Sequence, residues 1–368
     1  MPGFDLNELG WNDEFAENLE PGHVPGRVAA AHRGAFDVWT VAGAVRARLP
    51  GRALHDGLDV GVGDWVGLVD GLIRTVLPRR SAIVRNAAGL TTTAQTLAAN
   101  VDVAFVVSSL GPDLEPRRIE RYLVTIWESG ANPEIVLTKA DRLDDPWPLV
   151  AEVESVAIGV PVHVVSARTG QGCDALRARV PAGTTAVLLG SSGVGKSTLV
   201  NRWMWLEASP AKPATPGERP RYAYGVPVGD EVMLTRETRS DDDEGRHTTT
   251  HRQLLTLPGG GLVIDTPGLR ELQLWDVGVA SLDAAFTDLE ELAADCRFGD
   301  CTHEHEPGCA VLAAVDTGDL AHERLQSWRK LQRELLAIAM RHDALLRKQE
   351  VRKWKLRARE AHGRTRLR

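Results

Sequence analysis

The sequence has few cysteines, few tyrosines and phenylalanines, and no long hydrophobic run. Its 368 residues include four cysteines, three tyrosines and six phenylalanines. No apolar stretch approaches the roughly 18 to 20 residues that cross a bilayer, and residues 1–20 are acidic where a secretory signal would be basic. We therefore expect a protein of the cytoplasm without a membrane partner.

Charge is distributed unevenly along the chain. The formal net charge is −7, but residues 341–368 hold 11 Lys and Arg against 3 Asp and Glu, a local charge of +8 that leaves −15 for residues 1–340. Clustered cations bind phosphate backbones, so this segment, expected as a basic C-terminal helix, is suited to RNA. Trp354 within it could stack on a base. The alternative is an Arg-rich helix that only faces water.

Hydrophobic patterning predicts several domains, since a chain of this length holds more than one core. Residues 1–23 lack apolar periodicity and are expected to form a flexible leader. Short alternating runs follow, separated by Gly, Pro and Asp, and they are typical of a five-stranded all-β barrel of the OB-fold kind. This domain should span residues 24–85, with strands at Arg27–Ala31, Ala35–Val41, Val45–Leu49, Asp64–Val69 and Leu72–Leu77.

Residues 86–281 instead alternate strand and helix patterns. Such alternation predicts a doubly wound, largely parallel sheet, which binds ligands at the carboxyl ends of its strands. Residues 282–340 show only helical patterns around a Cys/His cluster. The expected strands are Val101–Val107, Glu134–Leu137, Val162–Val165, Ala186–Leu189 and Leu262–Ile264, and two of the expected helices are Glu115–Glu128 and Trp147–Val156.

Residues 190–197 read GSSGVGKS and match the phosphate-loop pattern G-x-x-x-x-G-K-[ST], between a predicted strand and a predicted helix. Backbone N–H groups of such a loop bind phosphate oxygens, Lys196 reaches the β- and γ-phosphates, and Ser197 offers a hydroxyl to Mg²⁺. The sequence thus predicts a phosphate site made of Gly190, Ser191, Ser192, Gly193, Val194, Gly195, Lys196, Ser197 and Thr198.

Two other motifs select guanine. Asp141 ends the tetrapeptide TKAD and can accept hydrogen bonds from the guanine N1–H and 2-amino group, a donor pair that adenine lacks. Ser166 and Ala167, after the predicted strand Val162–Val165, would place a backbone N–H near the guanine O6. Each motif alone could be an ordinary surface loop, but both follow predicted strands. The expected guanine-binding residues are Thr138, Lys139, Ala140, Asp141, Ser166 and Ala167.

Residues 265–268 read DTPG and also end a strand. Asp265 can hold the Mg²⁺ shell, while the Gly268 amide can approach the γ-phosphate. The order of the motifs is unusual, because both base motifs precede the phosphate loop and the Mg²⁺ loop.

This permuted order, with a barrel before it and a Cys/His cluster after it, resembles the RsgA (YjeQ) family of circularly permuted bacterial GTPases. Residues 245–250 (GRHTTT) are similar to the family's first switch region, and residues 81–85 (SAIVR) are similar to the sequence that follows the barrel in that family. The resemblance covers about residues 24–340. It implies an α/β fold in which an OB-fold barrel, a circularly permuted P-loop GTPase domain and a helical zinc-binding domain follow one another.

The activity that the resemblance implies is GTP hydrolysis on the small ribosomal subunit late in its assembly. The subunit and its rRNA would stimulate hydrolysis, and the protein would leave with GDP; we expect a monomer. Two departures from the family pattern stand out. Thr138 occupies a place where many members have Asn, which removes an amide contact to the base, and residues 203–228 have the character of an insertion.

Hydrolysis needs a group that orients the attacking water. Signalling GTPases use a glutamine just after the Mg²⁺-loop glycine, where this chain has Leu269, an apolar residue. His247 in the switch region is the best local candidate, as the resemblance also suggests; a plain surface histidine is the alternative. Thr249 is the first choice for the switch hydroxyl on Mg²⁺, and Thr248 the second.

Three of the four cysteines lie close together, in the pattern Cys296-x4-Cys301-x-His303-x5-Cys309. In a cytoplasmic chain such a cluster indicates metal rather than disulfides. Three thiolates and one imidazole complete a closed tetrahedral site, so Cys296, Cys301, His303 and Cys309 should hold one structural Zn²⁺. The spacing matches the C-terminal motif of the family. His305 is a substitute ligand that suits solvent better, and Cys173 stands alone.

The expected cofactors are therefore Mg²⁺ with GTP and one structural Zn²⁺. Two other functions stay open at this point. A P-loop kinase would have no use for Asp141, and a zinc-containing RNA-binding regulator would use GTP only as a binding switch. OB-like barrels also serve as protein-binding modules.

Overall fold

The structure is a computed structural model, and it describes residues 3–32, 34–55, 58–86, 94–205, 252–265 and 279–342. The chain divides into two compact units, Met1–Gln273 and Leu274–Arg368. Among the helices in the described ranges, none combines the length and apolar character that a membrane span requires.

The first unit begins with a closed five-stranded barrel. Strand β1 pairs antiparallel with β2 and β4, β2 pairs with β3, and β4 pairs with β5. Arg48, just after β3, closes the barrel against β5: its N–H donates to Gly71, and its carbonyl accepts from Ile73. A short helix between the third and fourth strands completes the OB-fold that the sequence predicted. The elements are β1 (Val24–His32), β2 (Ala35–Thr40), β3 (Gly43–Ala47), α2 (Gly51–His55), β4 (Trp65–Val69) and β5 (Leu72–Val76).

Residues 3–23 do not behave as the flexible leader that the sequence suggested. They include helix α1 (Asp13–Glu17), whose Phe15 is 1% exposed. The Phe15 ring lies 5.8 Å from the ring of Trp65 in the barrel, and the Trp11 ring lies 4.8 Å from the same indole. The prediction failed because a few irregularly spaced aromatic residues anchor this segment, and they leave no periodic pattern.

A hairpin that the sequence did not predict follows the barrel. It consists of β6 (Ala82–Asn86) and β7 (Ala94–Ala99), and Ala98 also bridges to Val62 of the barrel. The hairpin leads directly into the central sheet.

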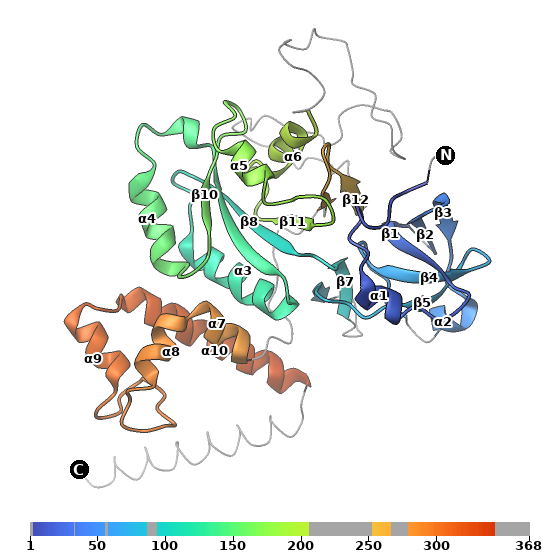
Figure 1. Cartoon of the computed structure of the whole chain (residues 1–368). Coiled ribbons are helices and arrows are strands. Elements are labelled where there is room, and N and C mark those ends of the chain that lie inside the picture. The colour runs from blue at the N-terminus through green and yellow to red at the C-terminus, as the bar shows by residue number, and fades with distance from the viewer. Residues whose placement is uncertain are drawn as a thin grey trace, which may run out of the picture. The chain divides into compact units, whose positions relative to one another are not determined.

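The central sheet has the strand order β10-β9-β8-β11-β13-β12, followed by the barrel strands. Neighbours from β10 to β13 are parallel, while β12 is antiparallel to β13 and meets β1 at Ala30 and Gln253. Helices α5 and α6 cover one face, and α3 and α4 cover the other (Figure 1). The strands are β8 (Val103–Ser109), β9 (Asn132–Thr138), β10 (Val162–Val164), β11 (Thr185–Leu189), β12 (Gln253–Thr256) and β13 (Leu262–Asp265).

The helices of this sheet are amphipathic and bury their apolar faces on it. Predicted and observed bounds agree within a residue for α3 and coincide for α4. Sequence patterning missed strand β12, which has only four residues. The helices are α3 (Pro116–Ser129), α4 (Trp147–Val156), α5 (Cys173–Arg177) and α6 (Lys196–Trp205).

The second unit is helical in its described part, as expected. Arg324 holds it together, donating to both carboxylate oxygens of Asp288 while its guanidinium lies 4.0 Å from the Phe286 ring centre. The predicted domain boundary at residue 281 falls inside α7, which packs on α8 and α10. The helices are α7 (Val279–Ala285), α8 (Thr287–Ala293), α9 (Ala310–Thr317) and α10 (His322–His342).

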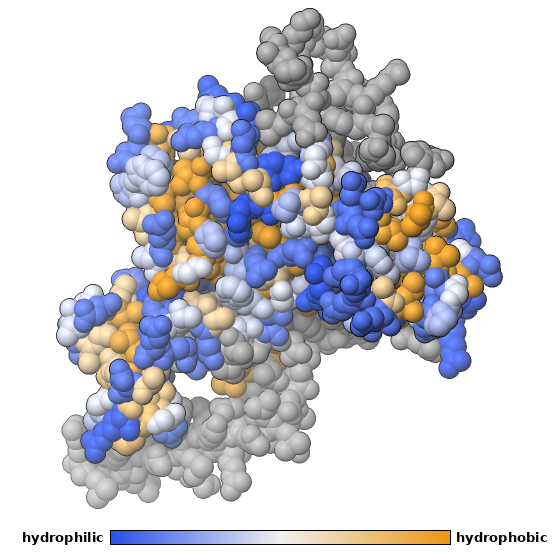
Figure 2. Space-filling view, viewed as in Figure 1, coloured by the Kyte–Doolittle hydropathy of each residue, from blue (hydrophilic) through white to orange (hydrophobic). Residues whose placement is uncertain are grey.

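The visible surface carries separate hydrophobic patches among polar and charged residues (Figure 2). Several large apolar side chains are exposed singly, including Trp147 and Val41 in the first unit and Phe298 in the second. Scattered exposure of this kind is ordinary for globular proteins.

Candidate functional site

The parallel strands of the central sheet bring the predicted nucleotide motifs to one edge. Strand β9 ends at Thr138, β10 at Val164 and β11 at Leu189, and all three run in the same direction. The loops that follow them therefore leave the sheet at a shared carboxyl edge, the usual ligand edge of such folds. Residues 25 to 56 positions apart in sequence become neighbours in this way.

The phosphate loop connects β11 to α6. Gly190 has a φ of 146°, and a Cβ there would overlap the carbonyl oxygen of Val107 on β8, so the loop needs glycine at this point. The Lys196 ammonium donates to the carbonyl oxygens of Gly190 (2.6 Å) and Ser191 (2.7 Å). This places a cation across the mouth of the loop, where phosphate oxygens bind in P-loop proteins.

Thr138 braces the base-binding segment against the phosphate loop. Its side chain is 2% exposed, and its hydroxyl donates to the carbonyl oxygen of Val194. Thr138 thus makes a polar link between the two loops. The sequence predicted only that Thr138 lacks the amide contact to the base that Asn would make, and it did not predict this link.

Asp141 and Ser166 come together from two different strands. The Ser166 hydroxyl donates to one carboxylate oxygen of Asp141 at 2.6 Å, and Arg168 lies 3.6 Å from the other. The hydrogen bond from Ser166 lowers the pKa of Asp141 below its ordinary value. The carboxylate is therefore ionised at neutral pH and acts only as an acceptor.

A cavity of about 440 Å³ lies beside the phosphate loop, between that loop, the end of β8 and helix α3. Arg118 on α3 lines it and donates to the Ser191 hydroxyl at 2.8 Å, while pairing with Glu115 at 2.6 Å. Lys139 of the base motif lines the same cavity. Arg118 belongs to no motif, and sequence reasoning missed its contact with the phosphate loop.

Several predicted site residues lie outside the described part of the chain. The backbone of Asp265 ends β13, and its side chain falls outside the description. His247, Gly268 and Leu269 lie wholly outside the description, as do most of the expected insertion and residues 343–368 of the basic tail. Trp203 and Met204, however, are buried in the core and belong to α6, so the insertion does not begin at residue 203. The remaining switch residues outside the description are Thr248 and Thr249.

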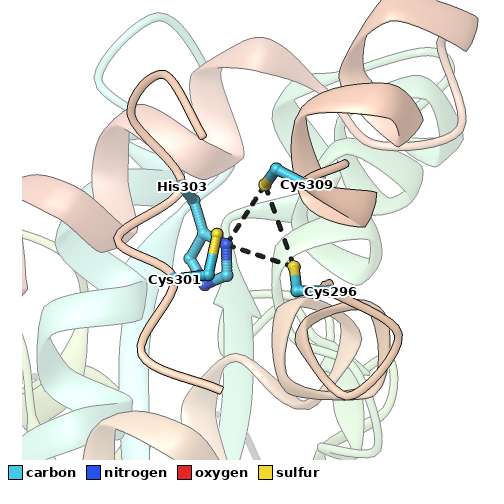
Figure 3. Close-up of side chains that lie close together, drawn as sticks. All are labelled: Cys296, Cys301, His303 and Cys309. Atoms are coloured by element: carbon cyan, nitrogen blue, oxygen red, sulfur yellow. Dashed lines mark hydrogen bonds between the residues drawn. The ribbon is translucent and has the colours of Figure 1, made fainter. Parts of the chain in front are cut away.

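The predicted metal ligands converge in the second unit (Figure 3). One ligand atom from each of the four residues lies within 4.8 Å of every other. The Sγ atoms of Cys296 and Cys309 are 3.8 Å apart, and the His303 Nδ1 lies 3.6 and 3.4 Å from them. Ligands of a tetrahedral zinc are separated by about 3.5 to 3.8 Å, given Zn–S near 2.3 Å and Zn–N near 2.0 Å. The cluster, completed by Cys301, therefore fits a metal ion of that size.

Charge and hydrogen bonding support this ligand set. Burial and the neighbouring thiols raise the pKa of Cys301 to about 11, and a bound cation would favour its thiolate form. Glu306 shapes the loop by accepting N–H bonds from Thr302 (3.0 Å) and Glu304 (2.9 Å). His305 is exposed and lies outside the cluster, as the sequence suggested.

Comparison with known proteins identifies the family. Residues 76–275 match the sequence model of the RsgA GTPase family. The protein named "Small ribosomal subunit biogenesis GTPase RsgA" of Streptomyces coelicolor is 47% identical over 95% of this chain and 91% of its own length. The chain belongs to the RsgA GTPase family. Its namesake in Streptomyces avermitilis is 46% identical over 95% of this chain and 89% of its own length.

Two solved structures share the fold. The crystal structure of YjeQ from Thermotoga maritima has 27% identity and a TM-score of 0.61, covering 85% of this chain and 99% of the YjeQ chain. The crystal structure of YloQ, described as a circularly permuted GTPase, has 22% identity and a TM-score of 0.58, with coverage of 86% and 96%. These comparisons confirm the resemblance, the permuted GTPase fold and the assignment as a GTP hydrolase.

Proposed function

We propose that this RsgA family member binds the small ribosomal subunit and assists its late maturation, with hydrolysis stimulated by the subunit and driving release. Full-length similarity to proteins named for small-subunit biogenesis supports the proposal. An rRNA contact suits the barrel and the basic segment 341–368, because only localised basic surfaces of an otherwise acidic chain can dock on RNA.

The observation that carries the nucleotide assignment is the Asp141 carboxylate, ionised and hydrogen bonded to Ser166. Asp141 follows Thr138, which contacts the phosphate loop. In the proposed complex Asp141 accepts from the guanine N1–H and 2-amino group. The Ala167 N–H donates to O6, and residues 190–198 with Lys196 bind the phosphates. The remaining base contacts come from Thr138, Lys139 and Ala140.

Mg²⁺ bound with GTP would neutralise developing charge on the transferred phosphoryl group. Its proposed protein ligands are Ser197, Asp265 and the hydroxyl of Thr249. The Gly268 N–H contacts the γ-phosphate. His247 orients the attacking water, because Leu269 offers no polar group. The metal of the Cys/His cluster is proposed to be one zinc with a structural role, since four protein ligands leave no open position.

Sedimentation with isolated small ribosomal subunits tests the ribosomal function. The protein should pellet with the subunits in a non-hydrolysable GTP analogue and remain in the supernatant in GDP. Lys196→Ala, which removes the phosphate-binding ammonium, should lose this nucleotide dependence. Equal pelleting in both nucleotides, or none, contradicts the proposal.

Single-turnover hydrolysis tests the catalytic assignment. His247→Ala should keep GTP affinity but lower the subunit-stimulated rate by roughly 10²- to 10⁴-fold, the range for a lost acid–base or orienting group. Full stimulation of the variant would show that the subunit or another residue positions the water. Membership of a GTPase family leaves no support for a P-loop kinase.

A further inference from the structure

We propose that Arg202, on the phosphate-loop helix, positions the loop that recognises the guanine 6-oxo group. The inference rests on the proposed base site and adds to it a residue outside the guanine motifs. The Arg202 guanidinium donates to the carbonyl oxygen of Ala167 at 3.1 Å, across 35 residues of chain. Arg202 is thus a positioning residue for the Ala167 N–H, the expected donor to O6.

The anchored loop is a tight turn with Ser166 at its base. The Gly170 N–H donates to the Ser166 carbonyl at 2.8 Å, and the Ser166 N–H donates to the Gln171 carbonyl at 2.9 Å. The Cys173 thiol also donates to the Ser166 carbonyl. These bonds fix the base of the turn, where Ser166 contacts Asp141, whereas Ala167 lies beyond them and is held by Arg202.

Gly170 has the geometry that this anchor requires. Its φ is 94°, and a Cβ built there would overlap the Arg202 guanidinium. The guanidinium therefore lies against the glycine while it donates to Ala167. A side chain at residue 170 would displace the guanidinium from this position.

Helix α6 gives the anchor its rigidity. Leu199 and Trp203 flank Arg202 in the helix, are 0% and 1% exposed, and belong to the core beneath the sheet. The same helix begins with Lys196, so the residues that carry the phosphate-binding ammonium and the guanidinium belong to one rigid body, with their Cα atoms about 9 Å apart along its axis. Helix α6 therefore fixes the distance between the phosphate site and the site that recognises the guanine 6-oxo group.

The anchor acts on the base contact through one residue. The N–H and the carbonyl of Ala167 lie in the two peptide units that meet at its Cα. Holding the carbonyl therefore restricts the backbone rotations at Ala167 that would turn the N–H away. Such preorganisation strengthens binding by reducing the ordering that the ligand must impose. Loss of the anchor should weaken recognition of O6 and leave recognition of the 2-amino group by Asp141 intact.

Nucleotide analogues separate these two contacts. IDP lacks the 2-amino group and keeps O6, whereas 6-thio-GDP keeps the 2-amino group and replaces O6 by sulfur, a weak acceptor. Dissociation constants for GDP, IDP and 6-thio-GDP would be measured by calorimetry. In the wild type, both analogues should bind more weakly than GDP.

Arg202→Met keeps the length of the side chain but removes the donor. We expect GDP affinity to fall about 3- to 10-fold, the range for one hydrogen bond. The GDP to 6-thio-GDP ratio should shrink toward one, while the GDP to IDP ratio stays at its wild-type value. Arg202→Lys should recover part of the GDP affinity. Gly170→Ala, which displaces the guanidinium without removing it, should reproduce the same change in ratios.

Arg177→Met is the matched control, because Arg177 also donates to distant backbone, the carbonyl oxygen of Pro258 at 2.6 Å, without touching the base loop. It should leave both ratios unchanged. If the folded Arg202→Met variant binds all three nucleotides more weakly by the same factor, or binds them as the wild type does, the inference is overturned. A wild type that does not separate GDP from IDP overturns the base role of Asp141 and this inference with it.

Discussion

The Arg27 guanidinium donates a 2.8 Å hydrogen bond to the Thr185 hydroxyl, across 158 residues of chain. Arg27 lies on β1 of the barrel and is 1% exposed, while Thr185 starts the strand that leads to the phosphate loop. The same guanidinium donates to carbonyl oxygens of Leu9, Gly63 and Asn100. Burial lowers the pKa of Arg27 to about 10, so it remains charged at neutral pH. One side chain thus joins the N-terminal segment, the barrel and the nucleotide-binding sheet.

Arg27→Met should lower the free energy of unfolding by about 2 to 4 kcal/mol, because it leaves several buried carbonyl oxygens without donors. Urea denaturation followed by tryptophan fluorescence measures this change. Arg46→Met, which removes an exposed ion pair with Asp37, serves as control and should cost less than about 1 kcal/mol. Equal effects of the two substitutions would show that Arg27 does not join these segments.

Thr138→Val removes the hydroxyl that links the base motif to Val194 and keeps the shape of the side chain. We expect GDP and GTP affinity to fall about 3- to 10-fold, since the phosphate loop loses a buried brace. Thr138→Ser retains the hydroxyl and should bind within about twofold of the wild type. Fluorescent nucleotide titration provides the measurement, and equal binding by the Val variant would contradict the bracing role.

Asp141→Asn replaces an acceptor by a group that can donate. The variant should lose GTP affinity and gain affinity for xanthosine triphosphate, whose 2-oxo group accepts where guanine donates. Competition between the two nucleotides reports the change in preference. An unchanged preference would remove Asp141 from the base pocket.

The Cys/His cluster should hold about one zinc per chain. Cys301→Ser, or removal of the metal by a chelator, should unfold the second unit and spare nucleotide binding, because the nucleotide site lies in the first unit. Elemental analysis and limited proteolysis test this. A metal-free protein with the proteolytic resistance of the wild type would exclude a structural metal.

Glu134 should make the free energy of unfolding depend on pH in the acidic range. Burial alone would raise its pKa, but hydrogen bonds from His163 and Arg179 hold the pKa below its ordinary value. A depressed pKa contributes stability that is present above the ordinary value of 4.5 and is lost as pH falls through the folded value. Glu134→Gln should lower the free energy of unfolding by about 1 to 3 kcal/mol at pH 7 and by less near pH 4.

Denaturation at several pH values compares this variant with the wild type. Glu154→Gln, on the exposed surface of α4, is the control and should leave the profile unchanged. A loss of stability that is the same at pH 4 as at pH 7 would mean that the Glu134 charge is not what stabilises the fold.

The chemistry of the protein can be read from short motifs in its sequence. The phosphate loop, the TKAD tetrapeptide and the Cys/His cluster are short, and each requires particular residue types at fixed spacing, so they could be recognised without coordinates. Helix α3 was predictable for a different reason, since its apolar residues recur with helical periodicity.

The contacts that hold these parts in place become visible only in the folded chain. Arg27, Arg118 and Arg202 each donate to a residue 35 to 158 positions away, and no local pattern marks an arginine for such a contact. The N-terminal segment packs through single aromatic side chains, which leave no periodicity to detect. Contacts of this kind depend on which surfaces the fold brings together, and the sequence specifies them only through the complete chain.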